Sequence, residues 1–276
     1  MLIKNTAMKF LLAMGILFTF NGTVTAEPIP RIVGGILAPN HAYPFMAAIE
    51  YSSDNIQFCG GTLIAPTKVL TAAHCLVTSE PIHVRIGTNN SVTDPGQIIS
   101  VISQVSHPKF NSSTLDYDVA VFTLATPVVL NDNKNLMKLP EACASLTCIT
   151  GLAKPATLVR TAGWGATNPN GSSGSASIDL RQVDVPLVDN ATCNAAVGPG
   201  VTARMICSGF AVGGKDSCNG DSGGPLFGYL GIARTGLQTG IVSWGVGNCG
   251  DPGTYGVYTR ISNPEVRLFI RQQSGR

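Results

Sequence analysis

The sequence predicts an exported, disulfide-bonded all-β protein, and three observations support that prediction. Short runs of β-branched and aromatic residues recur along the chain, separated by Gly, Pro, Asn and Ser. Examples are residues 62–64, 69–71, 83–86, 119–124 and 239–244. Such spacing is typical of β-sandwiches and closed barrels, not of alternating β-α units. The only convincing helical pattern lies near the C-terminal end, and the eight cysteines are typical of an exported, disulfide-bonded domain.

The N-terminus has the pattern of a secretory signal peptide, which we place at residues 1–26. Lys4 and Lys9 give it a positive start, residues 10–20 form an apolar core, and residues 24–26 have the small-x-small form of a cleavage site. A buried core helix, the alternative interpretation, does not explain this order of charge and apolar residues. The apolar run is too short to span a bilayer, and no later segment is long and apolar enough. We therefore expect a secreted protein without a membrane partner.

The charge balance implies no basic field that would attract nucleic acid or an anionic membrane. The chain has 18 Lys and Arg against 16 Asp and Glu, and residues 1–31 hold three of the basic residues and one of the acidic ones. Residues 32–276 are therefore formally neutral, so we expect no nucleic-acid partner. Their length suits one large all-β unit or two small barrels sharing a cleft. Hydrophobic periodicity lapses at residues 131–135, which marks a candidate connector between two barrels.

The helical pattern begins near residue 263. Asn263 or Ser262 can cap the helix, and Pro264 suits its first turn. Apolar residues then recur at helical spacing, at Val266, Phe269 and Ile270.

The cysteines favour disulfides over a metal site. Their count is even, none forms a Cys-x-x-Cys pair, and the histidines are not spaced beside them as zinc ligands. Cys143 and Cys148 bracket four residues, but no second pair follows to complete a site. We therefore expect neither a metal nor another cofactor.

Three short motifs point to one kind of chemistry. Residues 214–226 place an Asp-Ser pair among glycines, residues 71–75 read Thr-Ala-Ala-His-Cys, and residues 31–35 read Arg-Ile-Val-Gly-Gly. A Gly-Asp-Ser-Gly run alone could be an ordinary turn. Together the motifs resemble the serine peptidases of the chymotrypsin/trypsin family, and the resemblance covers the chain from Ile32 to its C-terminus. It implies a peptidase domain at 32–276, built as two six-stranded antiparallel β-barrels with the active site in the cleft between them and a short C-terminal helix.

The resemblance assigns catalytic roles to matching residues. Ser222 is the expected nucleophile, His74 the general base, and Asp118, which opens an apolar run, the carboxylate that orients the imidazole. Asp116 is offset by two residues, and we interpret it as a solvated loop residue. The other histidines are expected to have surface or packing roles: His41, His83 and His107. The backbone N–H groups of Gly220 and Ser222 would form the oxyanion hole.

The same resemblance predicts a pocket for a basic side chain. Asp216 matches the position at the pocket base, where a carboxylate would pair with a substrate Arg or Lys. Ser217 would add a hydroxyl contact, and the hydroxyl of Ser243 would also help to hold Asp118. The pocket walls would include Trp244, Gly245 and Gly256.

Residues 27–31 are the predicted activation peptide. In the family, a cut after a basic residue, here Arg31, frees a new amino terminus, here Ile32. Its ammonium would pair with Asp221 and order the oxyanion hole and the pocket. The amine pKa would be raised in this pair, so its stabilisation would be lost as pH rises through that pKa. The alternative is an unprocessed strand and turn at 32–35.

Three disulfides follow from the resemblance: Cys59–Cys75, Cys193–Cys207 and Cys218–Cys249. Cys143 and Cys148 remain and could close a small loop. The family's calcium loop uses several carboxylates, whereas the matching residues 87–97 offer only Asp94. Calcium needs about six to eight oxygen ligands, so we expect no calcium site.

These observations predict a secreted serine endopeptidase, made as a zymogen, that cleaves after Arg or Lys through an acyl-enzyme. Its expected partners are protein or peptide substrates, protease inhibitors, and the enzyme that cuts Arg31, which could be the protein itself. Two alternatives come from other classes of protein. One is a non-catalytic homologue that binds partners through the same fold, and the other is a disulfide-rich adhesion module.

Overall fold

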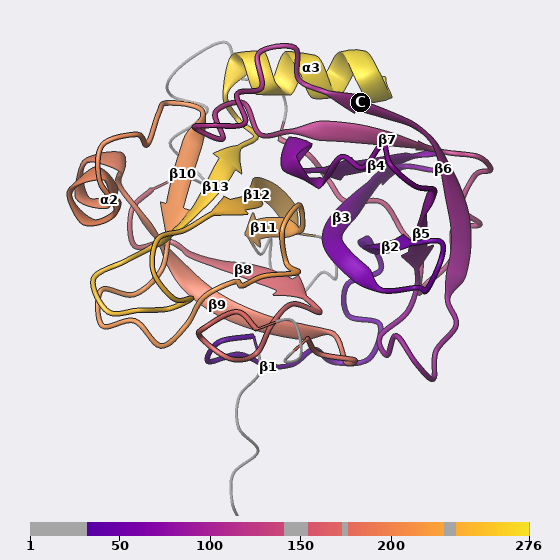
Figure 1. Ribbon diagram of the computed structural model, residues 1–276, viewed down its shortest axis with the longest axis horizontal. Helices are drawn as coiled ribbons and strands as arrows, with labels where there is room; N and C mark the ends of the chain where they lie inside the picture. Colours follow the sequence, from indigo (N-terminus) through magenta and orange to yellow (C-terminus); the bar gives the residue numbers. More distant parts are fainter. Residues whose placement is uncertain (1–31, 141–153, 173–175, 229–235, 276) are drawn as a thin grey trace, which may run out of the picture.

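The computed structural model describes residues 32–140, 154–172, 176–228 and 236–275, and two β-barrels lie side by side in it. In Figure 1 the first barrel is the indigo to magenta half, and the second barrel is the salmon to yellow half. Within these ranges no helix is long and apolar enough to cross a membrane. The predicted signal and activation peptides, and the Cys143–Cys148 pair, lie outside the described residues.

The first barrel is a closed antiparallel sheet in the order β2-β3-β4-β7-β6-β5. Its strands are β2 (Met46–Tyr51), β3 (Gln57–Ala65), β4 (Lys68–Thr71), β5 (Ile82–Ile86), β6 (Gln97–Ser106) and β7 (Ala120–Leu124). The β2–β5 pairing closes the ring. Branched and aromatic side chains fill its core, among them Ile49, Leu63, Val69, Val84 and Phe122.

The second barrel closes through the pairing of its first two strands, β8 and β9. Its strands are β8 (Leu158–Gly163), β9 (Arg181–Val188), β10 (Met205–Ser208), β11 (Pro225–Gly228), β12 (Leu237–Trp244) and β13 (Gly256–Arg260). A two-residue strand, β1 (Ile36–Leu37), pairs with the first two residues of β9, Arg181 and Gln182. The expected pair of six-stranded antiparallel barrels is therefore confirmed, and the connector at 131–135 lies between β7 and β8.

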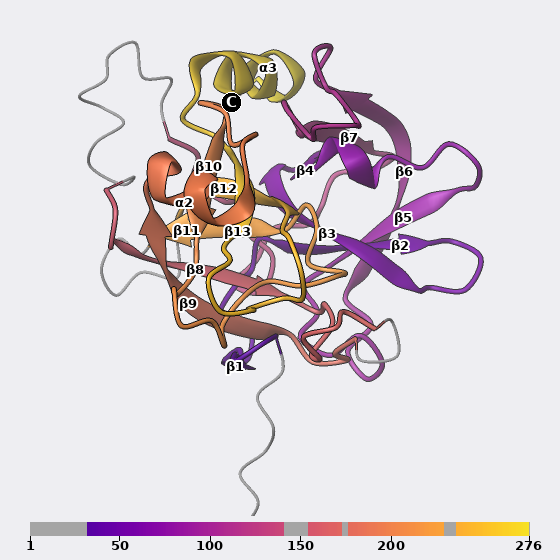
Figure 2. The same cartoon turned by 60° about the vertical axis from the view of Figure 1, so that its left-hand side comes forward.

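The predicted C-terminal helix is α3 (Pro264–Ser274). The side chain of Asn263 accepts hydrogen bonds from the N–H groups of Glu265 and Val266, as a helix cap does. The apolar face of α3 is formed by Val266, Phe269 and Ile270. These side chains are buried in one hydrophobic cluster with the core of the first barrel. Figure 2 shows α3 lying across one end of both barrels.

A second helix, α2 (Asn190–Val197), was not predicted from the sequence. Asp189 caps it through the N–H of Thr192, but Cys193 is its only buried residue. A helix with so small a buried face leaves no apolar repeat at helical spacing. A single 3-10 turn, η1 (Ala73–Cys75), follows β4 after one residue and is the other helical element of the described ranges.

Among the described residues, three disulfides join six cysteines in the predicted pairs. Cys59–Cys75 ties β3 to η1, Cys193–Cys207 ties α2 to β10, and Cys218–Cys249 joins two loops of the second barrel. The first and the last of these lie beside the candidate site.

Candidate active site

A histidine–aspartate pair lies where the two barrels meet. His74 is on η1, and Asp118 precedes β7 and is fully buried. The imidazole Nδ1 is 2.7 Å from Asp118 Oδ2, and the backbone N–H of His74 donates to Oδ1 at 2.9 Å. Because Nδ1 faces the carboxylate, Nε2 is the ring nitrogen left to exchange a proton with another group.

The second barrel supplies further donors to Asp118. The hydroxyl of Ser243, on β12, donates to Oδ2 at 2.6 Å, as the resemblance implied. The hydroxyl of Thr259, on β13, donates to the carbonyl oxygen of Asp118 at 2.6 Å. No sequence pattern indicated Thr259, because Thr259 and Asp118 are 141 positions apart in the chain.

Asp116 is not a solvated loop residue, so that interpretation was wrong. Its carboxylate accepts hydrogen bonds from Arg204 and, at 2.9 Å, from the hydroxyl of Thr202, both in the second barrel's half of the chain. Burial alone would raise the pKa of Asp116, but these hydrogen bonds hold it below its usual value. Its neighbours Leu115 and Tyr117 have left-handed φ angles of 52° and 55°. Such angles cost about 1 kcal/mol or more each, so we infer that the ion pair stabilises a strained loop beside Asp118.

Asp116→Asn is therefore expected to lower the free energy of unfolding by about 1–2 kcal/mol at pH 7. The folded-state pKa of Asp116 is depressed, so its contribution is present above about pH 4 and is lost as pH falls through that lower pKa. Urea denaturation at several pH values measures this. Asp132→Asn, at an exposed loop aspartate, is the matched control. Equal effects of the two variants at pH 7 would contradict the inter-barrel ion pair.

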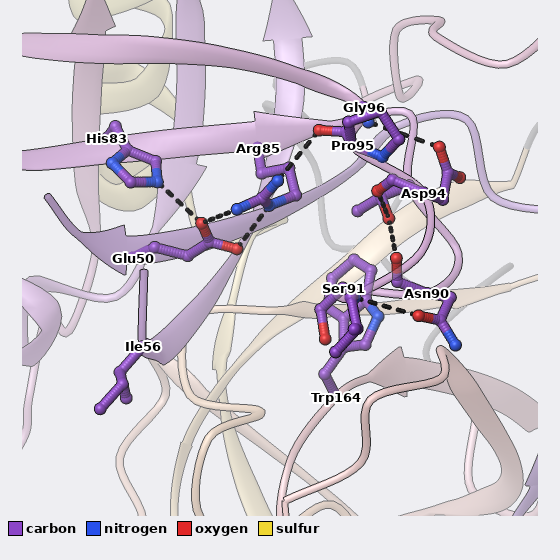
Figure 3. A network of polar contacts seen from close by, with 12 residues as sticks. Glu50, Ile56, His83, Arg85, Asn90, Ser91, Asp94, Pro95, Gly96 and Trp164 are labelled. Atoms are coloured by element: carbon purple, nitrogen blue, oxygen red, sulfur yellow. Dashed lines mark hydrogen bonds and ion pairs between the residues drawn. The ribbon is translucent and has the colours of Figure 1, made fainter. Parts of the chain in front are cut away.

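The remaining histidines have surface or packing roles, as expected. His83 is buried, and its Nε2 lies 2.7 Å from Glu50, which also accepts from the guanidinium of Arg85 (Figure 3). His107 stacks on Tyr117 with ring centroids 4.5 Å apart. His41 is half-buried in a turn.

The loop at 87–97 is held by hydrogen bonds within the protein. Figure 3 shows it beside Arg85, which donates to the carbonyl of Pro95 at 3.0 Å. The carboxylate of Asp94 accepts from the backbone N–H groups of Asn89 and Gly96. In the described ranges the one group with metal-like spacing is Cys59, His74 and Cys75, but its two sulfurs form a disulfide and offer no thiolate.

The segment around Ser222 exposes two backbone donors. The carbonyl of Asn219 accepts from Ala166 at 2.6 Å, and that of Asp221 accepts from Gly224 at 2.9 Å. In these two peptide groups, the N–H belongs to Gly220 and Ser222. Neither N–H donates to any described residue. Gly220 has a φ of 94°, which a residue with a side chain rarely adopts.

Asp221, within this segment, and Ile32 are both buried. The carboxylate of Asp221 accepts from the N–H groups of Cys218 and Gly165, each at 2.9 Å. Burial raises the pKa of Asp221 to about 6, although the two hydrogen bonds act in the opposite direction. The side chain of Ile32 lies in the core of the second barrel. The start of the predicted mature chain is therefore inside the protein.

Asp216 lines a pocket of about 120 Å³ together with Ser217, Ser222, Ser243, Trp244, Gly245 and Gly256. Its Oδ2 accepts from the N–H of Gly250 at 3.1 Å, and its Oδ1 has no hydrogen-bond partner among the described residues. Burial raises the pKa of Asp216 to about 7. A Cβ added to Gly256 would lie 2.7 Å from Oδ1, so only glycine leaves room beside the carboxylate.

Of two further pocket residues, Ser217 has a hydrogen-bond partner, whereas Gly245 borders open space. The hydroxyl of Ser217 is 3.1 Å from that of Tyr258, a contact that the sequence did not indicate. At Gly245 an added Cβ would meet no atom within 4 Å, so this residue borders open space.

Comparisons with known proteins agree with this architecture. The family model for trypsin matches residues 32–266. The chain is 39% identical to anionic trypsin of Bos taurus, over 90% of this chain and 93% of the relative. It is 39% identical to serine protease 1 of Rattus norvegicus (88% and 91%) and 37% identical to trypsin-3 of Salmo salar (84% and 89%). The fold and these matches define a serine endopeptidase. Within that class, the chain belongs to the trypsin family.

Proposed function

We propose that this trypsin-like endopeptidase is a secreted zymogen that, once cut after Arg31, cleaves peptide bonds following Arg or Lys. The observation that carries the specificity is Asp216, a buried carboxylate with one unpaired oxygen in the pocket beside Ser222. A buried acceptor without a partner is costly, and a guanidinium or ammonium supplies the missing donor and charge. The relatives named as trypsins support the same reading.

In the proposed mechanism, Ser222 attacks the substrate carbonyl carbon while His74 Nε2 takes the hydroxyl proton. A C–O bond forms, and the oxyanion is held by the N–H groups of Gly220 and Ser222. The C–N bond then breaks as His74 returns the proton to the leaving amine. Water then attacks the acyl-enzyme in the same way, with His74 taking its proton. The ester C–O bond breaks, and the proton returns to Ser222. Asp118 keeps Nδ1 protonated throughout and stabilises the imidazolium.

Covalent labelling tests the catalytic assignment. The purified protein, cut after Arg31, is treated with a diphenyl phosphonate that carries a basic side chain. We expect one adduct, on Ser222, and neither adduct nor turnover in Ser222→Ala. An unlabelled but folded and correctly cut protein would favour the non-catalytic homologue.

Asp216→Ser is expected to lower kcat/KM for Arg and Lys peptides by about 10²- to 10³-fold, because it removes one partner of a buried charge pair. The substitution should change kcat/KM little for peptides that carry an apolar residue before the cleaved bond. A panel of peptides that differ only in that residue measures the ratio of kcat/KM values for basic and apolar residues. Asp94→Ser, in the loop at 87–97, is the control for a lost loop carboxylate. If Arg and Lys cleavage survives in Asp216→Ser, the pocket assignment is wrong.

A protein that accepts Arg in this pocket can also cut its own Arg31. The rate of processing in purified precursor, as a function of protein concentration, separates self-activation from cutting by another protease. The pocket further suits protease inhibitors that present a basic side chain.

A further inference from the structure

One side chain of the first barrel reaches the backbone of the Ser222 segment. Gln57 is the first residue of β3, and its Nε2 donates to the carbonyl oxygen of Gly220 at 2.6 Å. Three residues later on the same strand, the N–H of Gly60 donates to the carbonyl of Ser222 at 2.7 Å. The first barrel therefore holds two carbonyls of a segment that belongs to the second barrel.

Gln57 binds the peptide group between the two free donors. Three consecutive peptide groups join Asn219 to Ser222, and the outer two carry the free N–H groups of Gly220 and Ser222. In the middle group, the N–H of Asp221 donates to Cys218 at 2.9 Å. Its carbonyl, that of Gly220, accepts from Gln57. Both ends of the middle peptide are thus fixed, and its rotation would turn both neighbouring donors.

We propose that Gln57 is a positioning residue, which holds the peptide between the two oxyanion donors from across the barrel interface. This inference rests on the proposed function, since it concerns the donors assigned to the oxyanion there. Gln57 does not line the pocket at Asp216; it acts through the carbonyl of Gly220.

The chemistry of glutamine suits the position. Its amide donates a hydrogen bond without adding charge, and it does not titrate between pH 4 and 10. A glutamate of the same length cannot donate when ionised, and it would bring negative charge toward the Gly220 carbonyl and the developing oxyanion. The two side chains have the same shape, so the exchange separates the hydrogen bond from packing.

The test compares four variants of the full chain, each cut after Arg31 and quantified by active-site titration. Gln57→Met removes the donor at similar length, Gln57→Glu reverses its polarity, and Gln57→His keeps an N–H donor. Gln104→Met is the matched control, because Gln104, on β6 of the same barrel, also bonds its side-chain amide to backbone, but at Val77 instead of the Ser222 segment. The readouts are kcat, KM, and the affinities for benzamidine and for a peptide boronate ending in boro-arginine.

We expect kcat to fall about 5- to 10-fold in Gln57→Met and further in Gln57→Glu, with KM and benzamidine affinity within about twofold of the parent. Boronate affinity should fall in parallel with kcat/KM, and Gln57→His should recover most of kcat. The Gln104→Met variant should keep all four values.

Two results would overturn the inference. In the first, Gln57→Met and Gln57→Glu match Gln104→Met in every value. In the second, benzamidine and boronate affinity fall together, which would indicate a general loss of structure. If the parent protein itself neither turns over nor labels at Ser222, the proposed function fails, and that failure is distinct from these two.

Discussion

Replacing Asp118 by Asn is expected to lower kcat by about 10⁴-fold at pH 7–8, while the fold and the binding of benzamidine are kept. The same substitution of the triad aspartate in a serine protease of this family lowers kcat by about this factor, so the magnitude is taken from that example. The present structure shows why it should apply here. One carboxylate oxygen faces the imidazole Nδ1, and the other accepts from the backbone N–H of His74.

An asparagine can satisfy only one of these two contacts as the aspartate does. If its oxygen accepts from the backbone N–H of His74, its NH₂ group faces Nδ1. The imidazole must then carry its proton on Nε2, where it cannot take the proton of Ser222. The reverse orientation sets NH₂ against N–H and leaves a buried donor unpaired.

Asp116→Asn is the matched control, since it makes the same change two residues away and leaves the imidazole untouched. We expect that control to retain kcat within about tenfold. The pH profile of kcat gives a second readout, because Asp118→Asn should recover activity at high pH, where hydroxide can act as the base. A variant that retains parental kcat at pH 7–8 would show that Asp118 does not set the tautomer of His74.

Sequence reasoning reaches furthest where the chemistry lies in short contiguous motifs. His74 and the segment 214–226 each lie in a run of residues that resembles a motif of the family, so the resemblance assigns their roles without reference to distant partners. The residue pattern alone left sandwich and barrel both open, because each has the same two-residue alternation. Closure depends on the β2–β5 and β8–β9 pairings, which no local pattern encodes.

The residues that sequence reasoning missed are those whose partners are distant in the chain. Gln57 lies 163 positions from Gly220, and Arg204 lies 88 from Asp116. Each is an ordinary polar residue in its own neighbourhood and becomes a positioning or bridging residue only when the two barrels meet. Asp116 was misread for the same reason, since its own loop is polar and its ion-pair partner comes from the other barrel.

Arg31→Gln is expected to yield a secreted, folded precursor whose kcat/KM is lower by about 10⁴-fold or more. In the uncut chain the nitrogen of Ile32 is part of a peptide bond and carries no charge. The buried carboxylate of Asp221 then has two backbone donors but no cation. Loss of one oxyanion donor costs about 10²- to 10³-fold, and both donors belong to the segment that Asp221 orders.

N-terminal sequencing and active-site titration measure this result. Arg31→Lys is the control, because an Arg/Lys-specific protease can still cut it and activity should return. Full activity in Arg31→Gln protein that still begins upstream of Ile32 would contradict the zymogen proposal.

The pH dependence of stability gives an independent test of the Ile32–Asp221 pair. Burial raises the folded-state pKa of Asp221 to about 6, above its unfolded value of about 3.9. An unpaired Asp221 therefore lowers the free energy of unfolding of the protein as pH rises through this interval. An ammonium on Ile32 stabilises the ionised carboxylate and removes that loss. In a Ser222→Ala background, which prevents self-digestion, the cut protein should therefore gain up to about 3 kcal/mol over the Arg31→Gln precursor between pH 4 and pH 7. The gain should decline again as pH rises through the raised pKa of the ammonium. A difference that stays constant from pH 4 to pH 10 would show that cleavage creates no buried ion pair.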